Sequence, residues 1–490
     1  MSSSPTPASA ARHARESQRP RIKVVLYNPR AVFFTMPLAL LAIGSELDPE
    51  VYEVVIIDGR LEGAAASEKV IAALRDAVCL GVTVLTGAPI SDALEISRAA
   101  KRAYPHIPVV WGGWHPSMFG RECLEESCVD VTVQGQGEAT FGEIVERLVS
   151  GRSLQGCAGC IVRLADGSIC ENPRRELLPV DRFRAHDYTL IPVERYFERK
   201  GKRQLDYISS QGCNFRCAFC SDPFVYGRKW VGLDPGLMGL RLKELWDRYR
   251  FDDVNFQDET FFTRRERVRA FAEHVLASGL QISWAGTMRA DQGVRLPDEI
   301  WALCKRAGLR RLLVGVESGS DAMLKRIRKD IRIEQVFHTA HKMREHGIAG
   351  NFPFIVGFPD EPDESIVATL DCAKRLRALS PDFQTPFFYF KPYPGSEIVI
   401  EAVKRGFELP ATLAAWSTFD FVDGLPGPWV SPEKFKLIER FKFFHEHAWR
   451  RSAPGTRGLL QKLARLRCKR DEYRWPIEML LWRETRPRLS

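Results

Sequence analysis

An alternation of apolar strand-like and amphipathic helix-like segments constrains the fold of this chain more than any other feature. The first series of strands is predicted at residues 22–27, 52–57, 80–85, 108–111 and 130–133. The helices between and after these strands are predicted at residues 36–47, 67–77, 91–104, 121–126 and 140–149. Strands buried on both faces are apolar throughout, and helices provide the crossovers between parallel strands. Residues 21–150 are therefore predicted to form an α/β domain with a doubly wound, Rossmann-like sheet.

A second alternating series begins near residue 201. Its strands are predicted at residues 207–209, 253–257, 282–287, 311–316, 352–356 and 387–390. Its longest helices are predicted at residues 235–248, 264–277, 297–307 and 364–379. The pattern predicts a second parallel α/β domain over residues 201–400, with its functional groups at the carboxyl ends of the strands.

The segments outside these two series are predicted to have separate roles. Residues 1–20 are rich in Ser, Pro and Ala and lack the apolar centre of a signal peptide, which predicts a disordered tail. Residues 151–200 are predicted to be a linker that contains a hairpin. Residues 401–490 are predicted to form a mainly helical cap, and its basic helix near residues 463–470 favours a solvated face over a membrane contact. Three cysteines of the linker are predicted to have no cofactor role: Cys157, Cys160 and Cys170.

The composition narrows the functional classes. A formal net charge of +9 is modest for 490 residues, so nucleic-acid binding has little support, while anionic substrates remain compatible with it. The longest apolar run, residues 31–47, contains Pro37 and is too short to span a membrane. Twelve cysteines occur without a visible secretory signal, which favours reduced thiols in a cytoplasmic, anaerobic setting.

Cys213, Cys217 and Cys220 follow a predicted strand, with three and then two residues between them. Thiolates are soft ligands for iron–sulfur clusters or zinc, and so short a loop can bring three of them to one centre. A closed zinc site needs four protein ligands, but residues 223–272 contain neither Cys nor His. The motif therefore favours a [4Fe-4S] cluster with one open iron. Zinc with a distant fourth ligand is the alternative.

The segment from Cys213 to Cys220 resembles the CxxxCxFC signature of the radical S-adenosylmethionine (SAM) superfamily, with Phe219 at its aromatic position. The resemblance implies a partial (β/α)6 barrel and a [4Fe-4S] cluster whose open iron is chelated by SAM. It also implies that one electron, delivered by a flavodoxin- or ferredoxin-type donor, cleaves SAM to a 5'-deoxyadenosyl radical.

Polar segments at the strand ends of the second series supply the candidate SAM-binding residues. They are Phe219, Asp258, Arg289, Glu317, Gly357, Phe358 and Pro359. SAM carries a carboxylate, an ammonium group, ribose hydroxyls and an adenine, so its site requires charges of both signs and closely approaching backbone. The resemblance implies that Glu317 and Asp258 face SAM and that residues 357–359 lie near its adenine or methionine part. Arg289 is a candidate partner for the SAM carboxylate.

The strand-end loops of the first series resemble those of the cobalamin-binding domain that precedes many radical SAM domains. The candidate cobalamin-binding residues are Asp58, Thr86, Gly112, Gly113, Gly135 and Glu138. The family signature DxHxxG, which supplies a histidine below cobalt, reads here Asp58-x-Arg60-x-x-Gly63. Arginine cannot donate a lone pair to cobalt. Cobalamin is therefore expected to bind without a histidine lower ligand, and loss of the cofactor is the alternative. His115, on another loop, is expected to be structural.

The resemblance covers residues 21–480 and is nearest to the branch that contains the anaerobic magnesium-protoporphyrin ester cyclase and cobalamin-dependent carbon methylases. The favoured function is methylation of an unactivated carbon. Radical cyclisation, rearrangement or oxygenation without methyl transfer is the enzymatic alternative. A non-catalytic cobalamin- or zinc-binding scaffold is the alternative from another class. The substrate is expected to be a small molecule such as a pigment, a lipid or a natural-product intermediate.

Overall fold

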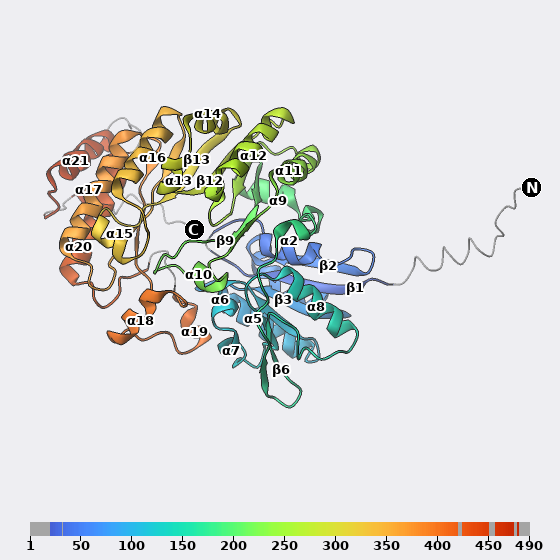
Figure 1. Ribbon diagram of the computed structural model, residues 1–490. Coiled ribbons are helices and arrows are strands. Elements are labelled where there is room, and N and C mark those ends of the chain that lie inside the picture. The colour runs from blue at the N-terminus through green and yellow to red at the C-terminus, as the bar shows by residue number, and fades with distance from the viewer. Residues whose placement is uncertain (1–19, 32, 420–423, 450–455, 475–477, 480–490) are drawn as a thin grey trace, which may run out of the picture. The chain divides into compact units, whose positions relative to one another are not determined.

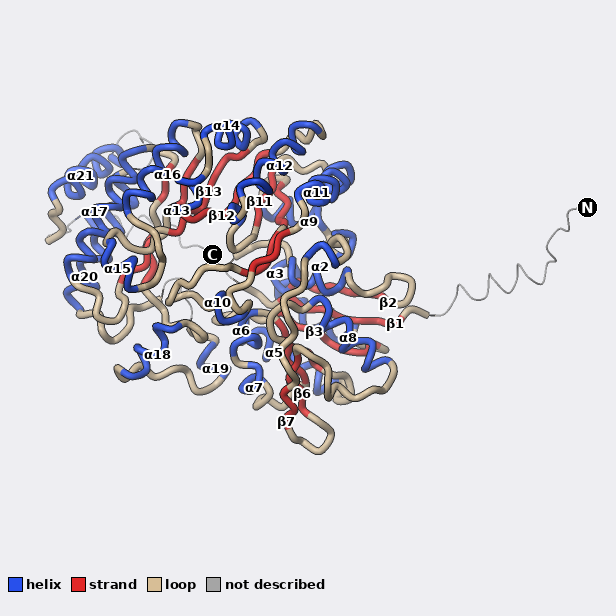
Figure 2. The backbone as a smooth tube through the Cα atoms, viewed as in Figure 1, coloured by secondary structure: helices blue, strands red, loops and turns tan. Residues whose placement is uncertain are grey.

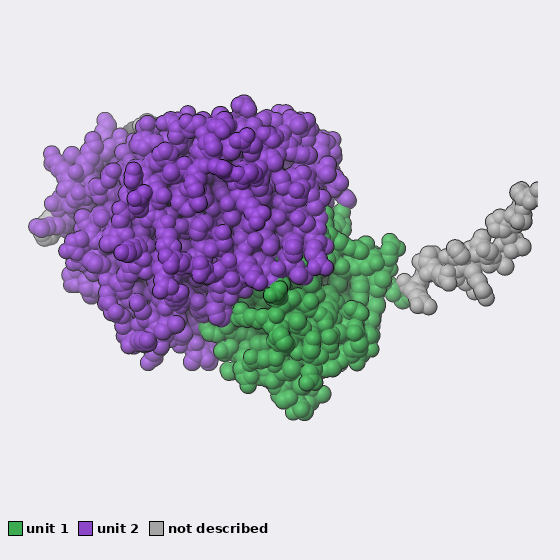
Figure 3. All heavy atoms as spheres, in the orientation of Figure 1, with its two compact units in different colours: residues 1–176, 183–193 green, residues 177–182, 194–490 purple. Residues whose placement is uncertain are grey.

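The structure is a computed structural model, and it describes residues 20–31, 33–419, 424–449, 456–474 and 478–479. Two compact units make up the chain, one of residues 1–176 and 183–193 and the other of residues 177–182 and 194–490 (Figure 3). The tail predicted for residues 1–20 lies, apart from Pro20, outside the described residues. None of the helices in the described ranges is both long and apolar enough to cross a membrane.

A seven-stranded sheet forms the centre of the first unit, in the order β2-β1-β3-β4-β5-β6-β7. Its strands are β1 (Ile22–Asn28), β2 (Tyr52–Asp58), β3 (Ala77–Thr83), β4 (Val109–Gly112), β5 (Val131–Val133), β6 (Cys160–Arg163) and β7 (Ile169–Glu171). The first five strands are parallel, as their apolar runs predict. Because β2 and β3 flank β1, the strand order reverses beside β1, and ligands of doubly wound sheets bind at such a switch point. The predicted doubly wound sheet is confirmed.

Helices connect these strands. They are α2 (Leu38–Ser45), α3 (Gly59–Glu62), α4 (Ala66–Ala73), α5 (Pro89–Ala103), α6 (Trp114–Met118), α7 (Gly120–Cys123) and α8 (Glu138–Val149). In α8 the apolar residues Phe141, Ile144 and Val145 recur on one face, which is buried in a core with Leu26 and Val110 of the sheet. This packing fixes the helix whose first turn follows the strand-end loop after β5.

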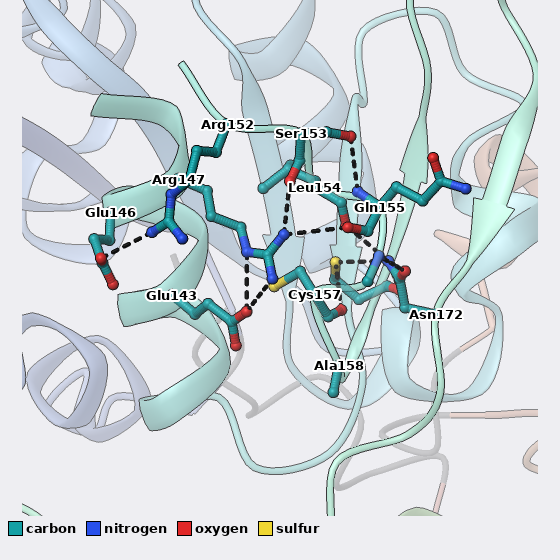
Figure 4. A network of polar contacts seen from close by, with 12 residues as sticks. Glu143, Glu146, Arg147, Arg152, Ser153, Leu154, Gln155, Cys157, Ala158 and Asn172 are labelled. Carbon is teal, nitrogen blue, oxygen red and sulfur yellow. Dashed lines mark hydrogen bonds and ion pairs between the residues drawn. The ribbon is translucent and has the colours of Figure 1, made fainter. Parts of the chain in front are cut away.

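The hairpin predicted in the linker belongs to the first unit. β6 pairs antiparallel with β5 and with β7, so the hairpin extends the sheet. Cys157 and Cys160 are fully buried in the core beside it. Figure 4 shows how the loop before β6 is held: the guanidinium of Arg147 on α8 donates to the carbonyls of Ser153 at 2.8 Å and Gln155 at 3.1 Å. Both cysteines therefore lie in an apolar core, next to a loop that Arg147 holds in place.

A six-stranded parallel sheet forms the centre of the second unit, and its strands are drawn in red in Figure 2. In spatial order they are β8 (Gln204–Tyr207), β11 (Asp253–Phe256), β12 (Ser283–Arg289), β13 (Leu309–Gly315), β14 (Ala349–Asn351) and β16 (Phe383–Gln384). The last two strands continue, after breaks at Pro353 and Pro386, as a parallel pair of β15 (Phe354–Val356) and β17 (Phe387–Tyr389). The strands predicted at residues 352–356 and 387–390 correspond to β15 and β17, whereas β14 and β16 were not predicted. Proline removes a ladder hydrogen bond, which explains the break between each pair of segments.

The helices of the second unit include the four that the sequence predicts at residues 235–248, 264–277, 297–307 and 364–379. In chain order this unit contains α9 (Val193–Lys200), α11 (Pro235–Tyr249), α12 (Arg265–Ala277), α13 (Ala290–Arg295), α14 (Asp298–Arg306), α15 (Asp321–Arg326), α16 (Ile333–Glu345), α17 (Asp363–Leu379), α18 (Glu397–Lys404), α19 (Leu413–Trp416), α20 (Pro432–Ala448) and α21 (Thr456–Arg470). Figure 1 shows α12, α14 and α16 along the outer side of the strands. Six strands with outer helices form the expected partial barrel, and α20 and α21 pack together after it.

Candidate cofactor sites

A short hairpin presents the cysteine loop at the carboxyl end of β8. Its strands are β9 (Ser210–Gly212) and β10 (Trp230–Gly232), with α10 (Asp222–Val225) between them. The strand predicted at residues 207–209 overlaps β8 only at Tyr207, where β8 ends. Gly212 has a φ of +79°, and a side chain there would place Cβ 2.3 Å from the carbonyl oxygen of Lys229. Glycine is therefore required where the chain enters the loop.

Cys213, Cys217 and Cys220 are all partly buried in this loop and form no disulfide. Burial raises the pKa of Cys213 to about 11 and also raises the pKa of Cys220. Among the described residues no three His, Cys, Asp or Glu side chains converge closely enough to hold a single metal ion. The ligands of a four-iron cluster bind different irons, so their sulfurs need not converge on one point. Three thiols on one glycine-initiated loop fit a cluster better than a closed zinc site.

Arg289, at the end of β12, reaches the cysteine loop. Its Nη1 lies 3.6 Å from Sγ of Cys217, and its guanidinium carbon lies 3.8 Å from the centre of the Phe215 ring. Its Nη2 donates to the carbonyl of Lys329 at 2.5 Å, and its Nε donates to Asp291 at 3.0 Å. The guanidinium is thus oriented by partners from the cysteine loop, from helix α13 and from the segment after α15.

Glu317 and Lys329 form a buried ion pair beside the same loop. Nζ of Lys329 donates to Oε1 of Glu317 at 2.8 Å and lies 5.8 Å from the centre of the Phe219 ring. Burial alone would lower the pKa of Lys329, but the negative charges of the Glu317 carboxylate and of an ionised Cys217 outweigh it, so this pKa is raised. Glu317 has a φ of +70°, a conformation that non-glycine residues adopt mainly where the surroundings enforce it. A Cβ at Gly315 would lie 2.6 Å from Oε1 of Glu317.

The Gly357–Pro359 segment follows β15 and contacts the cysteine motif through aromatic rings. Phe358 lies 6.2 Å from Phe219, edge to face. The carboxylate of Glu361 accepts hydrogen bonds from the backbone N–H groups of Gly357 at 2.6 Å and Phe358 at 3.2 Å. The indole N–H of Trp429 donates to the carbonyl of Gly357 at 2.7 Å. Sequence reasoning named this segment but not Glu361 or Trp429, because their partners are backbone groups.

Asp258 and Glu259, adjacent in sequence, have different surroundings. The carboxylate of Asp258 accepts hydrogen bonds from Ser209 N–H at 2.8 Å, Ser209 Oγ at 2.6 Å and Ser210 Oγ at 2.5 Å. These bonds turn the chain after β8, and contact of Asp258 with SAM stays a prediction. Oε2 of Glu259 is buried without a hydrogen-bond partner among the described residues. Burial and then the nearby Asp222 raise the pKa of Glu259 well above its ordinary value.

In the first unit, Ser117 joins two of the predicted cobalamin loops. Its Oγ donates to the carbonyl of Gly113 at 2.7 Å and accepts from the N–H of Gly135 at 2.9 Å. Gly113 has a φ of +99°, and an added Cβ would lie 3.0 Å from the backbone of Val84. Glu138 is buried in the first turn of α8. The predicted residues Gly113 and Gly135 are therefore held together by a serine of α6 that sequence reasoning missed, since a single serine gives no signal in the sequence.

Arg60 is held in place at the carboxyl end of β2. Its Nη2 and Nε donate to the two carboxylate oxygens of Asp58 at 2.9 and 3.1 Å, and its Nη1 donates to the carbonyl of Phe33 at 3.0 Å. His115 is fully buried, with Nδ1 3.1 Å from Oγ1 of Thr86, and burial lowers its pKa to about 4. The predicted residues Asp58 and Thr86 therefore each have a polar partner, which is Arg60 for Asp58 and His115 for Thr86.

Comparison with known proteins identifies both units. The B12 binding domain model matches residues 11–145, and the radical SAM superfamily model matches residues 207–373. An uncharacterized methyltransferase of Pyrococcus horikoshii is 30% identical over 80% of this chain and 84% of its own. The anaerobic magnesium-protoporphyrin IX monomethyl ester cyclase of Synechocystis sp. is 27% identical over 73% of this chain and 71% of its own. The solved structure of the radical SAM methyltransferase TsrM from Kitasatospora setae has a TM-score of 0.72 at 18% identity, and the alignment covers 91% of this chain and 95% of that chain.

These similarities extend over both units and keep their order along the chain. The TsrM similarity shows a shared fold, and the Pyrococcus relative is alike over most of both sequences. A radical SAM domain implies a [4Fe-4S] cluster and SAM, and a B12 binding domain supports cobalamin as a further cofactor. The chain therefore belongs to the radical SAM superfamily of enzymes, among the members that carry a B12 binding domain ahead of the radical SAM domain.

Proposed function

We propose that this enzyme methylates an unactivated carbon of a small-molecule substrate. The observation that carries the proposal is the presence, in one chain, of a B12 binding domain and of a radical SAM domain in which the Glu317–Lys329 pair lies beside the cysteine loop. The Pyrococcus relative is named a methyltransferase, which supports the same reaction class.

Cys213, Cys217 and Cys220 would hold the [4Fe-4S] cluster, which supplies one-electron reduction when bound. In the radical SAM unit, Glu317 and Lys329 offer a carboxylate and an ammonium group for the oppositely charged ends of SAM. The Gly357–Pro359 backbone, fixed by its hydrogen bonds, suits contact with the adenine or methionine part. We add Glu259 to the SAM-binding residues, because its carboxylate is buried with an oxygen that accepts no hydrogen bond from any described residue.

The strand-end loops of the first unit would hold cobalamin, which supplies a transferable methyl group when bound. Gly112 and Gly113 leave backbone exposed to a bulky ligand, and Ser117 keeps their loop beside Gly135. Arg60 occupies the position of the usual histidine and is committed to Asp58. We propose that cobalamin binds here without a protein nitrogen below cobalt.

The reaction requires an external one-electron donor of the flavodoxin or ferredoxin type and reduced cysteines, so we place it in the cytoplasm under anaerobic conditions. The substrate classes that we propose are pigments, lipids and natural-product intermediates. Oxidative cyclisation is the second candidate function, because a relative that covers 73% of this chain is named a cyclase.

Transfer of label from SAM tests the proposal. Anaerobically reconstituted enzyme is incubated with SAM labelled in its methyl group, a low-potential reductant and an extract of small molecules, and products are separated by mass spectrometry. A methyltransferase yields a labelled product that carries one added methyl group, together with 5'-deoxyadenosine. 5'-Deoxyadenosine with an unlabelled product that has lost hydrogen supports cyclisation instead and contradicts the methylation proposal.

A further inference from the structure

We propose that Arg289 sets the reduction potential of the [4Fe-4S] cluster by holding a buried positive charge against the sulfur of Cys217. The inference rests on the ligation of the cluster by Cys213, Cys217 and Cys220 proposed above. It assigns Arg289 a positioning and tuning role in place of the contact with the SAM carboxylate that the sequence predicts.

The hydrogen bonds of Arg289 carry the assignment. Its side chain is only 8% exposed, and each of its three guanidinium nitrogens has a protein partner. Nη1 lies 3.6 Å from Sγ of Cys217, within hydrogen-bonding distance for sulfur. Nε and Nη2 are held by the Asp291 carboxylate and the Lys329 carbonyl, which leave Nη1 directed at the cysteine loop. A guanidinium committed in this way has little freedom to turn toward a ligand.

The Phe215 ring fixes the same charge from a second direction. Its centre lies 3.8 Å from the guanidinium carbon, so the cation is stacked on a residue of the cysteine loop itself. Arg289 therefore contacts the loop between Cys213 and Cys217 at two points, a ring and a sulfur. Movement of the loop relative to β12 would break both contacts.

The electrostatic consequence has a definite sign. Reduction adds one negative charge to the cluster, and a nearby buried cation stabilises the reduced form more than the oxidised form. Hydrogen bonds to cluster sulfurs act in the same direction, and both raise the reduction potential. Asp291 offsets part of the Arg289 charge, and Glu317 likewise offsets the ammonium group of Lys329, so the N–H donor that Arg289 directs at Cys217 adds to what remains of its charge. Removal of Arg289 should therefore make the cluster harder to reduce.

Anaerobic redox titration followed by electron paramagnetic resonance measures this effect directly. The titration compares the wild type with Arg289→Met, which removes the charge and the N–H donors, and with Arg289→Lys, which keeps a charge but loses the planar fork. Iron and sulfide content is measured for each protein. We expect the Met variant to shift the reduction equilibrium about tenfold toward the oxidised cluster, which is ~59 mV for one electron, and the Lys variant to shift it less in the same direction.

Arg295→Gln is the matched control. Arg295 lies one helical turn after Asp291 and pairs with the same carboxylate as Arg289, but its side chain is 64% exposed. Its replacement should leave the potential at the wild-type value. If the Met variant fails to retain iron and sulfide, the reduction potential of the Lys variant tests the inference in its place.

A wild-type potential in either Arg289 variant that retains a full cluster overturns the inference, and leaves the ligation proposal intact. A full cluster in Cys217→Ala would instead overturn the ligation proposal. The two failures are therefore distinguished by separate measurements.

Discussion

The ammonium group of Lys329 donates a 2.8 Å hydrogen bond to the carboxylate of Glu317, and both side chains are about nine-tenths buried. Neither charge has enough water around it to be stable alone, so each depends on the other. The pair lies between the aromatic residue of the cysteine motif and the strand end that carries Gly315. It links the cysteine loop to the residues proposed to bind SAM.

Lys329→Met is expected to lower the free energy of unfolding by about 3–5 kcal/mol, because it leaves the Glu317 carboxylate buried without a cation. Glu317→Gln, which keeps shape and a hydrogen-bond acceptor, is expected to retain iron and sulfide but to weaken SAM binding. Thermal unfolding and equilibrium dialysis with labelled SAM measure these effects. Lys325→Met, at an exposed position of α15, is the control. Unchanged SAM affinity in the Gln variant would remove Glu317 from the SAM site.

Asp258→Ala is expected to act mainly on the loop after β8. The substitution removes the acceptor of three hydrogen bonds from Ser209 and Ser210 and should cost more than about 2 kcal/mol. Cluster content per folded chain should fall with it, since the loop that follows is no longer anchored. Stability and iron measured together test this expectation. Wild-type stability combined with weak SAM binding would instead restore the direct contact predicted from the sequence.

The three cysteines of the motif and those of the hairpin are expected to differ in their effects on the cluster. Replacement of Cys213, Cys217 or Cys220 by Ala should abolish the charge-transfer absorption of the reconstituted protein and its reductive cleavage of SAM. Cys157→Ala and Cys160→Ala should retain both, because these thiols lie in the core of the first unit, and Cys170→Ala should behave in the same way. A cluster that survives in Cys217→Ala but is lost in Cys157→Ala would show that the wrong loop had been assigned.

Periodicity was sufficient to predict both sheets, because buried parallel strands and crossover helices leave a pattern that does not depend on distant residues. It did not predict the hairpin of β9 and β10, whose short strands carry no alternation and form where Asp258, distant in sequence, turns the chain. The motif located the cysteines and Glu317, but not Lys329. Lysine in a loop is usually exposed, and only the fold places this one against a carboxylate.

A buried histidine in the cap predicts a stability change with pH. Nε2 of His445 lies 2.6 Å from Oγ1 of Thr385, and burial, with nearby Arg377 and Lys374, lowers the pKa of His445 to about 3. Below the ordinary value of 6.5 the unfolded chain binds a proton that the folded chain does not. Stability is therefore fully present above that pH and is lost as the pH falls, by at most about 1.4 kcal/mol per unit for this group.

Denaturant unfolding at pH 7.5 and 5.5 measures this contribution. His445→Gln should lose less stability between the two values than the wild type, whereas replacement of the exposed His338 by Gln should leave the dependence unchanged. Identical pH dependence in wild type and His445→Gln would contradict the assignment.

Arg60 occupies the position of the histidine in the cobalamin signature. Its guanidinium is committed to both oxygens of Asp58 and to the carbonyl of Phe33, and it has no lone pair for cobalt. Co(II) cobalamin, when bound here, should therefore have no protein nitrogen below cobalt. Electron paramagnetic resonance reports this, because a nitrogen below cobalt splits each line into three. We expect no such splitting in the wild type. Splitting that disappears in His115→Ala would show that His115 leaves its buried contact with Thr86 to bind cobalt, and would contradict the histidine-free site.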